Sequence, residues 1–221
     1  MAEYIVKRLE GCLPDIRGKD FDPDRDMAGA EYAAIALYPW DESGYTPEAR
    51  AYVFYDGKGL HALMCAREET ICAKETRFCG DVCCDSCLEF FVAPRPEKTA
   101  DYINLECNIL TTMYFAIGPD RFSRRKPEAL PEGVCPAASR HSGGWWAVSF
   151  HVPMDLLRKE FGIERLEPGQ VMRGNFYHCD ETIHPNFGTW NPVTSVKPDF
   201  HRPECFGTLR LGGDAVRLLR T

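Results

Sequence analysis

The sequence has 221 residues, of which 44% are hydrophobic and 27% charged, and its formal net charge is −7. A chain of this size can bury a large core, and β-sandwiches of about 200–250 residues are common as one unit, so we expect residues 1–221 to form a single domain. The acidic charge argues against nucleic acids and membranes as partners, because both favour a basic face.

The first residues lack the apolar segment of a secretory signal, and no run approaches the roughly 18 apolar residues of a spanning helix. Eleven cysteines are an odd number, which would leave a thiol unpaired in an oxidising compartment. We therefore expect a cytoplasmic protein with free thiols. An extracellular protein stays open if the chain is a trimmed one.

Short strand patterns separated by turns run along the whole chain. The expected strands cover 3–9, 33–38, 51–55, 60–65, 71–76, 87–92, 102–109, 110–117, 145–152, 171–179 and 206–211. Residues 10–30, 118–143 and 180–205 are expected to be irregular connections. One helix is predicted at 154–161, between Pro153 and Gly162. This order predicts an all-β fold, an antiparallel β-sandwich or jelly roll with one short helix.

Two neighbouring strands carry the most informative pattern. Side chains alternate between the two faces of a strand, so Leu88, Phe90 and Val92 share one face of 87–92. The opposite face of this strand and the next carries carboxylates, amides and an aromatic ring: Glu89, Tyr102, Asn104, Glu106 and Asn108. We call this set the polar face. Such groups hydrogen-bond hydroxyls, which makes the polar face our candidate binding site.

The strand at 171–179 offers a third row of the same chemistry, with Arg173, Asn175 and Tyr177 on one face. Sugars are bound by planar polar groups and by aromatic rings that stack on their C–H surfaces. The expected ligand is thus a mono- or oligosaccharide. The alternative is a solvated sheet face with internal ion pairs, such as Arg173 with Glu106.

Six segments in order carry a family resemblance: DSCLEFFVAP, YINLECN, GGWWAVSFHVP, RGNFYHCDE, HPNFGTWNPV and DFHRPECFGTL. Over Cys83–Leu209 the chain resembles the family 9-like carbohydrate-binding domains, within the wider DOMON-like sandwich group. The resemblance implies non-catalytic sugar binding on one face of a β-sandwich. It requires no cofactor, although family members can hold a structural calcium.

The resemblance also implies an aromatic clamp around a terminal sugar ring. Glu89 matches the acidic residue of the family strand, and Trp190 matches the second clamp aromatic. The first clamp aromatic lies six residues before that acid, where this chain has Cys83. Tyr55 or Tyr102 could substitute, or the site has decayed and the domain serves another interaction.

Two further classes stay open. Glu89 and Glu106 could be the acid and base of a glycoside-processing enzyme, although we expect binding without catalysis. Two residue groups could be interpreted as metal-binding sites. The first is Cys79, Cys83, Cys84 and Cys87, and the second is His178, Cys179, Asp180, His184 and His201. The four cysteines lie within nine residues, not in two separated pairs, which favours free thiols. We therefore expect no metal site; the sequence leaves the oligomeric state open.

Overall fold

A computed structural model describes residues 1–17, 20–182 and 184–218. Its strands are β1 (Glu3–Leu9), β2 (Ala33–Ile35), β3 (Glu48–Asp56), β4 (Gly59–Arg67), β5 (Cys87–Ala93), β6 (Tyr102–Asn108), β7 (Met113–Gly118), β8 (Ala137–Arg140), β9 (Trp145–Pro153), β10 (Val171–Asp180), β11 (Asn186–Thr189) and β12 (Gly207–Val216). They form one curled sheet in the order β7-β6-β5-β10-β12-β1-β3-β4-β9-β8, with β11 on β10 and β2 on β3. The predicted sandwich is confirmed.

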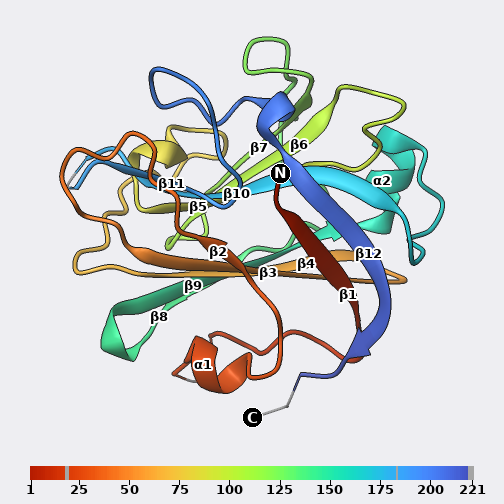
Figure 1. The fold of residues 1–221 in the computed structure, drawn as a ribbon, viewed down its shortest axis with the longest axis horizontal. Coiled ribbons are helices and arrows are strands. Elements are labelled where there is room, and N and C mark those ends of the chain that lie inside the picture. The colour runs from red at the N-terminus through yellow and green to blue at the C-terminus, as the bar shows by residue number, and fades with distance from the viewer. Residues whose placement is uncertain (18–19, 183, 219–221) are drawn as a thin grey trace.

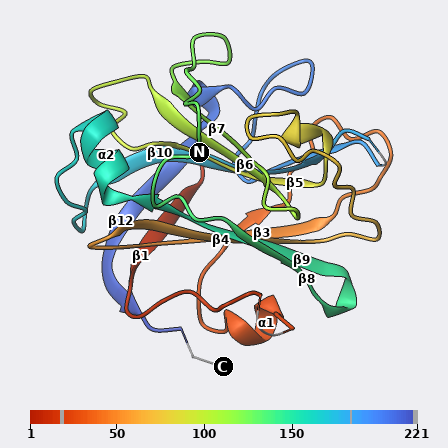
Figure 2. The same ribbon diagram turned by 180° about the vertical axis from the view of Figure 1, so that it is seen from behind.

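The sheet folds into two layers that face each other (Figures 1 and 2). One layer holds β5, β6, β7 and β10, and the other holds β3, β4, β8 and β9, while β1 and β12 cross between them at one side. Most neighbouring strands pair antiparallel, as predicted, whereas β1 pairs in parallel with both β12 and β3. This arrangement arises because the first and last strands of the chain are neighbours.

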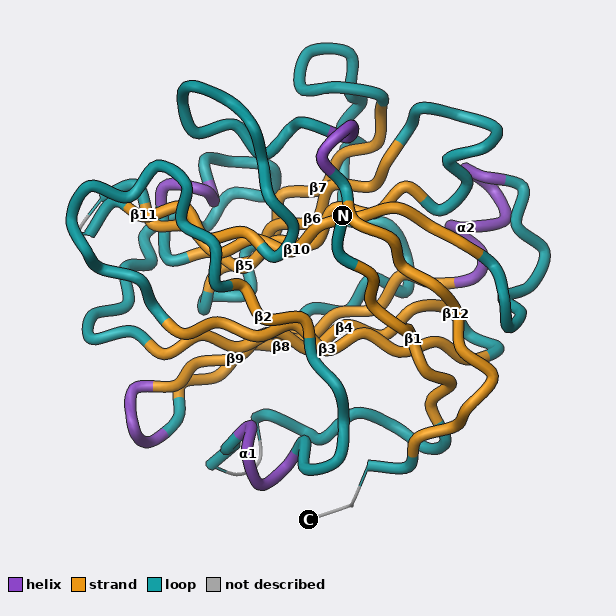
Figure 3. Tube along the Cα trace, in the orientation of Figure 1, coloured by secondary structure: helices purple, strands orange, loops and turns teal. Residues whose placement is uncertain are grey.

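The main core fills the space between the layers. Leu88, Phe90 and Val92 of β5 are fully buried there, as their alternation predicts. The opposite face of this layer is also covered: Phe91, Tyr177 and Phe200 belong to a second buried cluster on its outer side. Loops therefore lie over the outer face of β5, β6 and β10, where the sequence placed the polar face; Figure 3 shows how much of the chain around the layers is loop.

The hairpin of β3 and β4 and the helix α2 (Met154–Phe161) confirm their sequence signals, and Gly162 ends α2 with φ of 62°. The loop expected at 10–30 also contains a single helical turn of four residues, α1 (Pro23–Asp26), which follows the N-cap Asp22. Two short strands lie in segments that were expected to be loops, β8 in 118–143 and β11 in 180–205.

The strand expected at 71–76 does not form. Cys72 instead exchanges bonds with Ser86, whose N–H donates to its carbonyl. The N–H groups of Lys74 and Glu75 donate to the Asp85 carboxylate. Side-chain acceptors therefore satisfy backbone groups that a ladder would otherwise use.

A buried polar network joins the two layers. Glu68, at the end of β4, accepts hydrogen bonds from Trp146 Nε1 of β9 at 2.6 Å and from the Ser86 hydroxyl at 2.7 Å. His178 of β10 places Nε2 2.7 Å from the same carboxylate, and its Nδ1 lies 2.8 Å from the Asn186 side-chain oxygen. All members are almost fully buried, so each polar group depends on the others for its partner.

We expect Glu68→Ala to lower the free energy of unfolding by about 3–5 kcal/mol, the usual cost of removing one partner from a buried pair. The exposed neighbour Glu69 provides the control, because Glu69→Ala should change stability by no more than about 0.5 kcal/mol. Urea unfolding of both variants and the parent measures the difference. Equal stability of the two variants would show that the network contributes little.

Candidate functional site

The candidate site begins with the register of three strands. On the outer face of the layer formed by β5, β6, β7 and β10, Glu89 of β5 lies directly opposite Glu106 of β6 on one side and Tyr177 of β10 on the other. Asn104 is two residues from Glu106 on the same face and is paired with Phe91. Antiparallel pairing thus collects the polar side chains that alternate along each strand.

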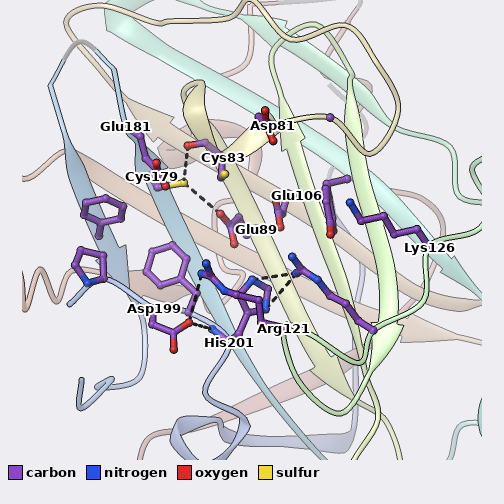
Figure 4. A pocket seen from close by; sticks show the side chains of 16 residues that line it. Asp81, Cys83, Glu89, Glu106, Arg121, Lys126, Cys179, Glu181, Asp199 and His201 are labelled. Atoms are coloured by element: carbon purple, nitrogen blue, oxygen red, sulfur yellow. Dashed lines mark hydrogen bonds and ion pairs between the residues drawn. The ribbon is translucent and has the colours of Figure 1, made fainter. Parts of the chain in front are cut away.

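Glu89 and Glu106 form part of the floor of a cavity of about 270 Å³ (Figure 4). Glu89, Glu106, Cys83 and Cys179 lie at its base, and the base extends from the strands β5, β6 and β10. One wall comes from the segment after β7, and the other from residues 198–201 and Phe187. The wall residues are Tyr114, Arg121, Arg124, Lys126, Phe187, Pro198, Asp199, Phe200 and His201, with Gly80, Asp81 and Glu181 at the rim.

Both glutamates are buried: Glu89 is 2% exposed and Glu106 is 4% exposed. Burial raises the pKa of Glu89 well above its usual value, the Glu106 carboxyl adds to this, and the Cys179 thiol and Arg124 oppose it. Burial also raises the pKa of Glu106, opposed mainly by the Asn104 amide, which donates to it at 3.0 Å. Carboxyl groups that keep protons to higher pH can donate hydrogen bonds as well as accept them.

The facing wall is basic. Arg124 and Lys126 both lie over the ring of Tyr114, with 4.6 Å and 4.4 Å to its centroid. Such cation–π contacts fix the direction of two long side chains that would otherwise be free. Arg124 also donates to the Asn104 side-chain oxygen and, at 3.0 Å, to His201 Nε2. The wall and the floor are therefore linked by hydrogen bonds.

His201 contacts both Arg124 of the wall and Tyr102 of β6. Burial, followed by the charges of Arg124 and Arg121, lowers its pKa to about 2, so the ring is neutral at pH 7. Arg124 Nη1 lies 3.0 Å from Nε2 and 3.3 Å from Nδ1, and the Tyr102 hydroxyl lies 2.9 Å from Nδ1. A neutral ring offers Arg124 a nitrogen that can accept its hydrogen bond.

The sequence pattern of carbohydrate-binding family 9 matches residues 22–211. The chain belongs to this family. No match is found among curated proteins. Of solved structures, a putative carbohydrate-binding protein from Bacteroides uniformis is 25% identical, with a TM-score of 0.77 over 95% of this chain and 98% of that one.

Two structures of a family 9 module from Caldicellulosiruptor kristjanssonii are each 11% identical to this chain. The complex with cellotriose has a TM-score of 0.66 over 96% of this chain and 94% of that one. The complex with glucose has a TM-score of 0.67 over 96% of both chains. At this identity the likeness shows the fold alone, which agrees with the sandwich described above.

Only two of the nine residues predicted for the family 9 site line the cavity, namely Glu89 and Glu106. Three others contact residues that line it. Tyr102 holds His201, and Asn104 bridges Glu106 and Arg124. Tyr177 is fully buried, stacks on Phe200 at 4.1 Å and donates its hydroxyl to the Phe200 carbonyl. It therefore fixes a wall of the cavity.

The other four predicted residues lie away from the cavity and have structural partners. Asn108 donates to Asp85 and accepts from the N–H of Thr112. Arg173 donates to the Phe206 carbonyl at 3.0 Å.

Asn175 exchanges hydrogen bonds with the Asn191 backbone. Trp190 packs against Tyr4 and Phe176 beside the main core. It is therefore not placed to clamp a ligand at Glu89. Cys83, at the position of the other clamp aromatic, does line the cavity.

The basic wall is what sequence reasoning missed. Its signal in the sequence is the cluster of Arg121, Arg124, Arg125 and Lys126 in 118–143, a segment expected to be an irregular connection. The structure turns this segment back through two hydrogen bonds between Ile117 and Arg125. No periodicity in the sequence indicates such a return.

The two residue groups weighed as metal sites do not each gather at one point. His178 points between the layers, whereas Cys179, the next residue, faces the cavity side. Among the described residues, one set of three potential ligands is found, Cys87, Glu89 and Cys179. Its two thiols are unlike the oxygen ligands that calcium prefers, so the set does not fit the structural calcium of the family. Also, no described helix is long and apolar enough to span a membrane.

Acid should destabilise the fold through His201. An unfolded histidine has a pKa near 6.5, whereas the pKa of His201 in the folded protein is much lower. Below about pH 6.5 the unfolded chain therefore binds a proton at this residue that the folded protein does not bind, and the free energy of unfolding falls as the pH decreases. With allowance for solvent screening of this partly buried ring, we expect His201 to cause about 1 kcal/mol of the loss between pH 7 and pH 5.

Urea unfolding of His201→Gln at both pH values should show a correspondingly smaller loss. The exposed His184 provides a control, because His184→Gln should lose as much stability as the parent. A His201→Gln protein with the parental pH dependence would contradict a buried neutral ring at this position.

Proposed function

We propose that this chain binds a sugar without transforming it, in the cavity above Glu89 and Glu106. The observation that carries the proposal is the pairing of two buried carboxyl groups with a basic and aromatic wall across a small cavity. Family membership supports the same class of ligand. The cavity has about 270 Å³, at or below the lower end of ligand pockets, which span about 300–1,000 Å³. This size favours one sugar ring or a chain end.

The groups around the cavity match the chemistry of a sugar ring. Glu106 and Glu89 offer oxygen atoms that accept or donate to neighbouring hydroxyls, and Arg124 and Lys126 offer donors from the opposite wall. Phe187 and Phe200 give the third side apolar surface for C–H groups. No tryptophan clamp is required, because the ring is enclosed from the floor and two walls.

The related Caldicellulosiruptor module was solved with glucose and with cellotriose, so these two sugars are the natural first probes. The identity of the sugar is a finer question than the fold likeness addresses. A glycan array followed by calorimetry of its best ligands would define it. The site predicts binding of terminal rings over internal segments of a polymer.

We expect Glu106→Ala to weaken binding of the best sugar by about 10- to 100-fold, because a hydrogen bond to an ionisable group contributes about 1.5–3 kcal/mol. Lys126→Gln should weaken it several-fold without risk to the fold, since Lys126 is on the surface. The exposed Lys98 lies away from the cavity, so Lys98→Gln is the matched control and should bind as the parent does. Calorimetric titration gives all four affinities.

Two outcomes would contradict this site. Equal affinities of Lys126→Gln, Glu106→Ala and the parent would place the sugar elsewhere on the domain. No binding of any sugar at millimolar concentrations would instead favour a family 9 domain whose sugar site has decayed, the reading that Cys83 kept open.

The same geometry argues against hydrolysis. A glycosidase places its two carboxyl groups on either side of the scissile bond. Glu89 and Glu106 are direct neighbours on adjacent strands and both lie in the floor, on one side of any ring in the cavity. We therefore expect no release of nitrophenol from aryl glycosides by the parent above the rate of Glu89→Gln. Turnover that this substitution abolishes would establish an enzyme instead.

A further inference from the structure

Three potential metal ligands meet at the base of the cavity, and two of them line it. Cys87 and Glu89 are two residues apart on β5 and therefore share a face, and Cys179 of β10 lies directly opposite Cys87. One ligand atom from each lies within 4.8 Å of the other two, and the Cys179 sulfur is 3.2 Å from Glu89 Oε1. All three side chains are buried.

These separations are close to those of a tetrahedral zinc site. Zinc binds sulfur at about 2.3 Å and carboxylate oxygen at about 2.0–2.2 Å, so tetrahedral ligand atoms lie about 3.6–3.8 Å apart. The observed separations, up to 4.8 Å, are within about 1 Å of these distances. Two strands that are already hydrogen-bonded hold the ligands in place.

The ligands are poorly satisfied without an ion. Within the described part of the chain, the one hydrogen bond to the Glu89 carboxyl comes from the Cys179 thiol, which is a weak donor. The hydrogen bonds of the protein to this carboxyl are therefore few and weak. A cation that displaces the shared protons would supply the missing interaction.

We propose that Cys87, Glu89 and Cys179 bind one zinc ion and leave its fourth position open to the cavity. Thiolates select zinc over calcium or magnesium, whose ligands are oxygen atoms. Glu89 and Cys179 both line the cavity, so the fourth position faces the space where a ligand enters. Three protein ligands with an open position are the arrangement of zinc sites that bind a water or an external ligand.

The charges of the cavity suit this ion. Two thiolates and one carboxylate around Zn²⁺ leave a net charge of −1, and binding releases the protons of both thiols and of any protonated carboxyl. Across the cavity, Arg124 and Lys126 make no ion pair among the described residues and stand on the Tyr114 ring. Their positive charge offsets the charge of the metal centre.

The sequence gives no local signal for this set of three ligands. Four cysteines lie close together in 79–87, but only Cys87 contributes, and its partner Cys179 is 92 positions further along the chain. The proposal does not depend on sugar binding, although an open position on zinc could hold a sugar hydroxyl. Cys83 lies beside Cys179, with 3.5 Å between the Cys179 sulfur and the Cys83 carbonyl oxygen, and its thiol is not among the three ligand atoms.

Titration of the reduced, metal-free protein with Co²⁺ tests the proposal by absorption spectroscopy. We expect one equivalent to bind with a thiolate-to-cobalt charge-transfer band and a tetrahedral visible spectrum, and Zn²⁺ to displace it. Cys179→Ala should weaken Zn²⁺ binding by more than the roughly 10–100-fold that loss of an outer partner of a metal ligand costs. Glu89→Gln, which keeps the side-chain shape, should weaken it as well.

Cys107→Ala is the matched control, because Cys107 is equally buried on β6 but belongs to the core between the layers. It should bind cobalt as the parent does. Absence of the band in the parent at excess Co²⁺ would overturn the proposal even if a variant failed to fold. A band that persists in Cys179→Ala and Glu89→Gln would also overturn it, because other residues would then hold the metal. Sugar affinity is measured separately, so either proposal can fail alone.

Discussion

The pairing of β10, β5 and β6 is the constraint on which the site depends. It sets Glu89 directly between Glu106 and Tyr177 and opposes Cys87 with Cys179. A shift by one residue would turn every one of these side chains to the other face of the sheet. The aliphatic residues that alternate with them fill the core between the layers, so packing on one face fixes the register that chemistry on the other face uses.

The cavity itself is made by chain that leaves the sheet and returns. The segment after β7 comes back through the Ile117–Arg125 bonds and brings the basic wall. The segment before β12 brings Phe200 and His201, and its position depends on Tyr177 and Tyr102 beneath it. Residues that the sequence suggested as direct sugar contacts thus hold the walls in place. Changing them would affect binding through the shape of the cavity.

The strand faces and the end of the helix could be predicted from the sequence, whereas the positions of the loops and the order of the strands could not, for physical reasons. Alternation along β5 and β6 predicted that Glu89 and Glu106 share a face, because strand periodicity is a local property. The end of α2 at Gly162 was equally local. The positions of Trp190 and Lys126 could not be predicted, because each lies in an irregular segment whose position depends on distant partners. The approach of Cys179 to Cys87 likewise requires knowledge of which strands are neighbours.

The central claim is that a sugar enters the space above Glu89 and Glu106. Nuclear magnetic resonance of the backbone amides during a sugar titration tests it most directly. The account predicts that the largest shifts fall on β5, β6, residues 118–126 and residues 198–201. Shifts concentrated around Trp190, or spread over the β3, β4 and β9 layer without these segments, would contradict it.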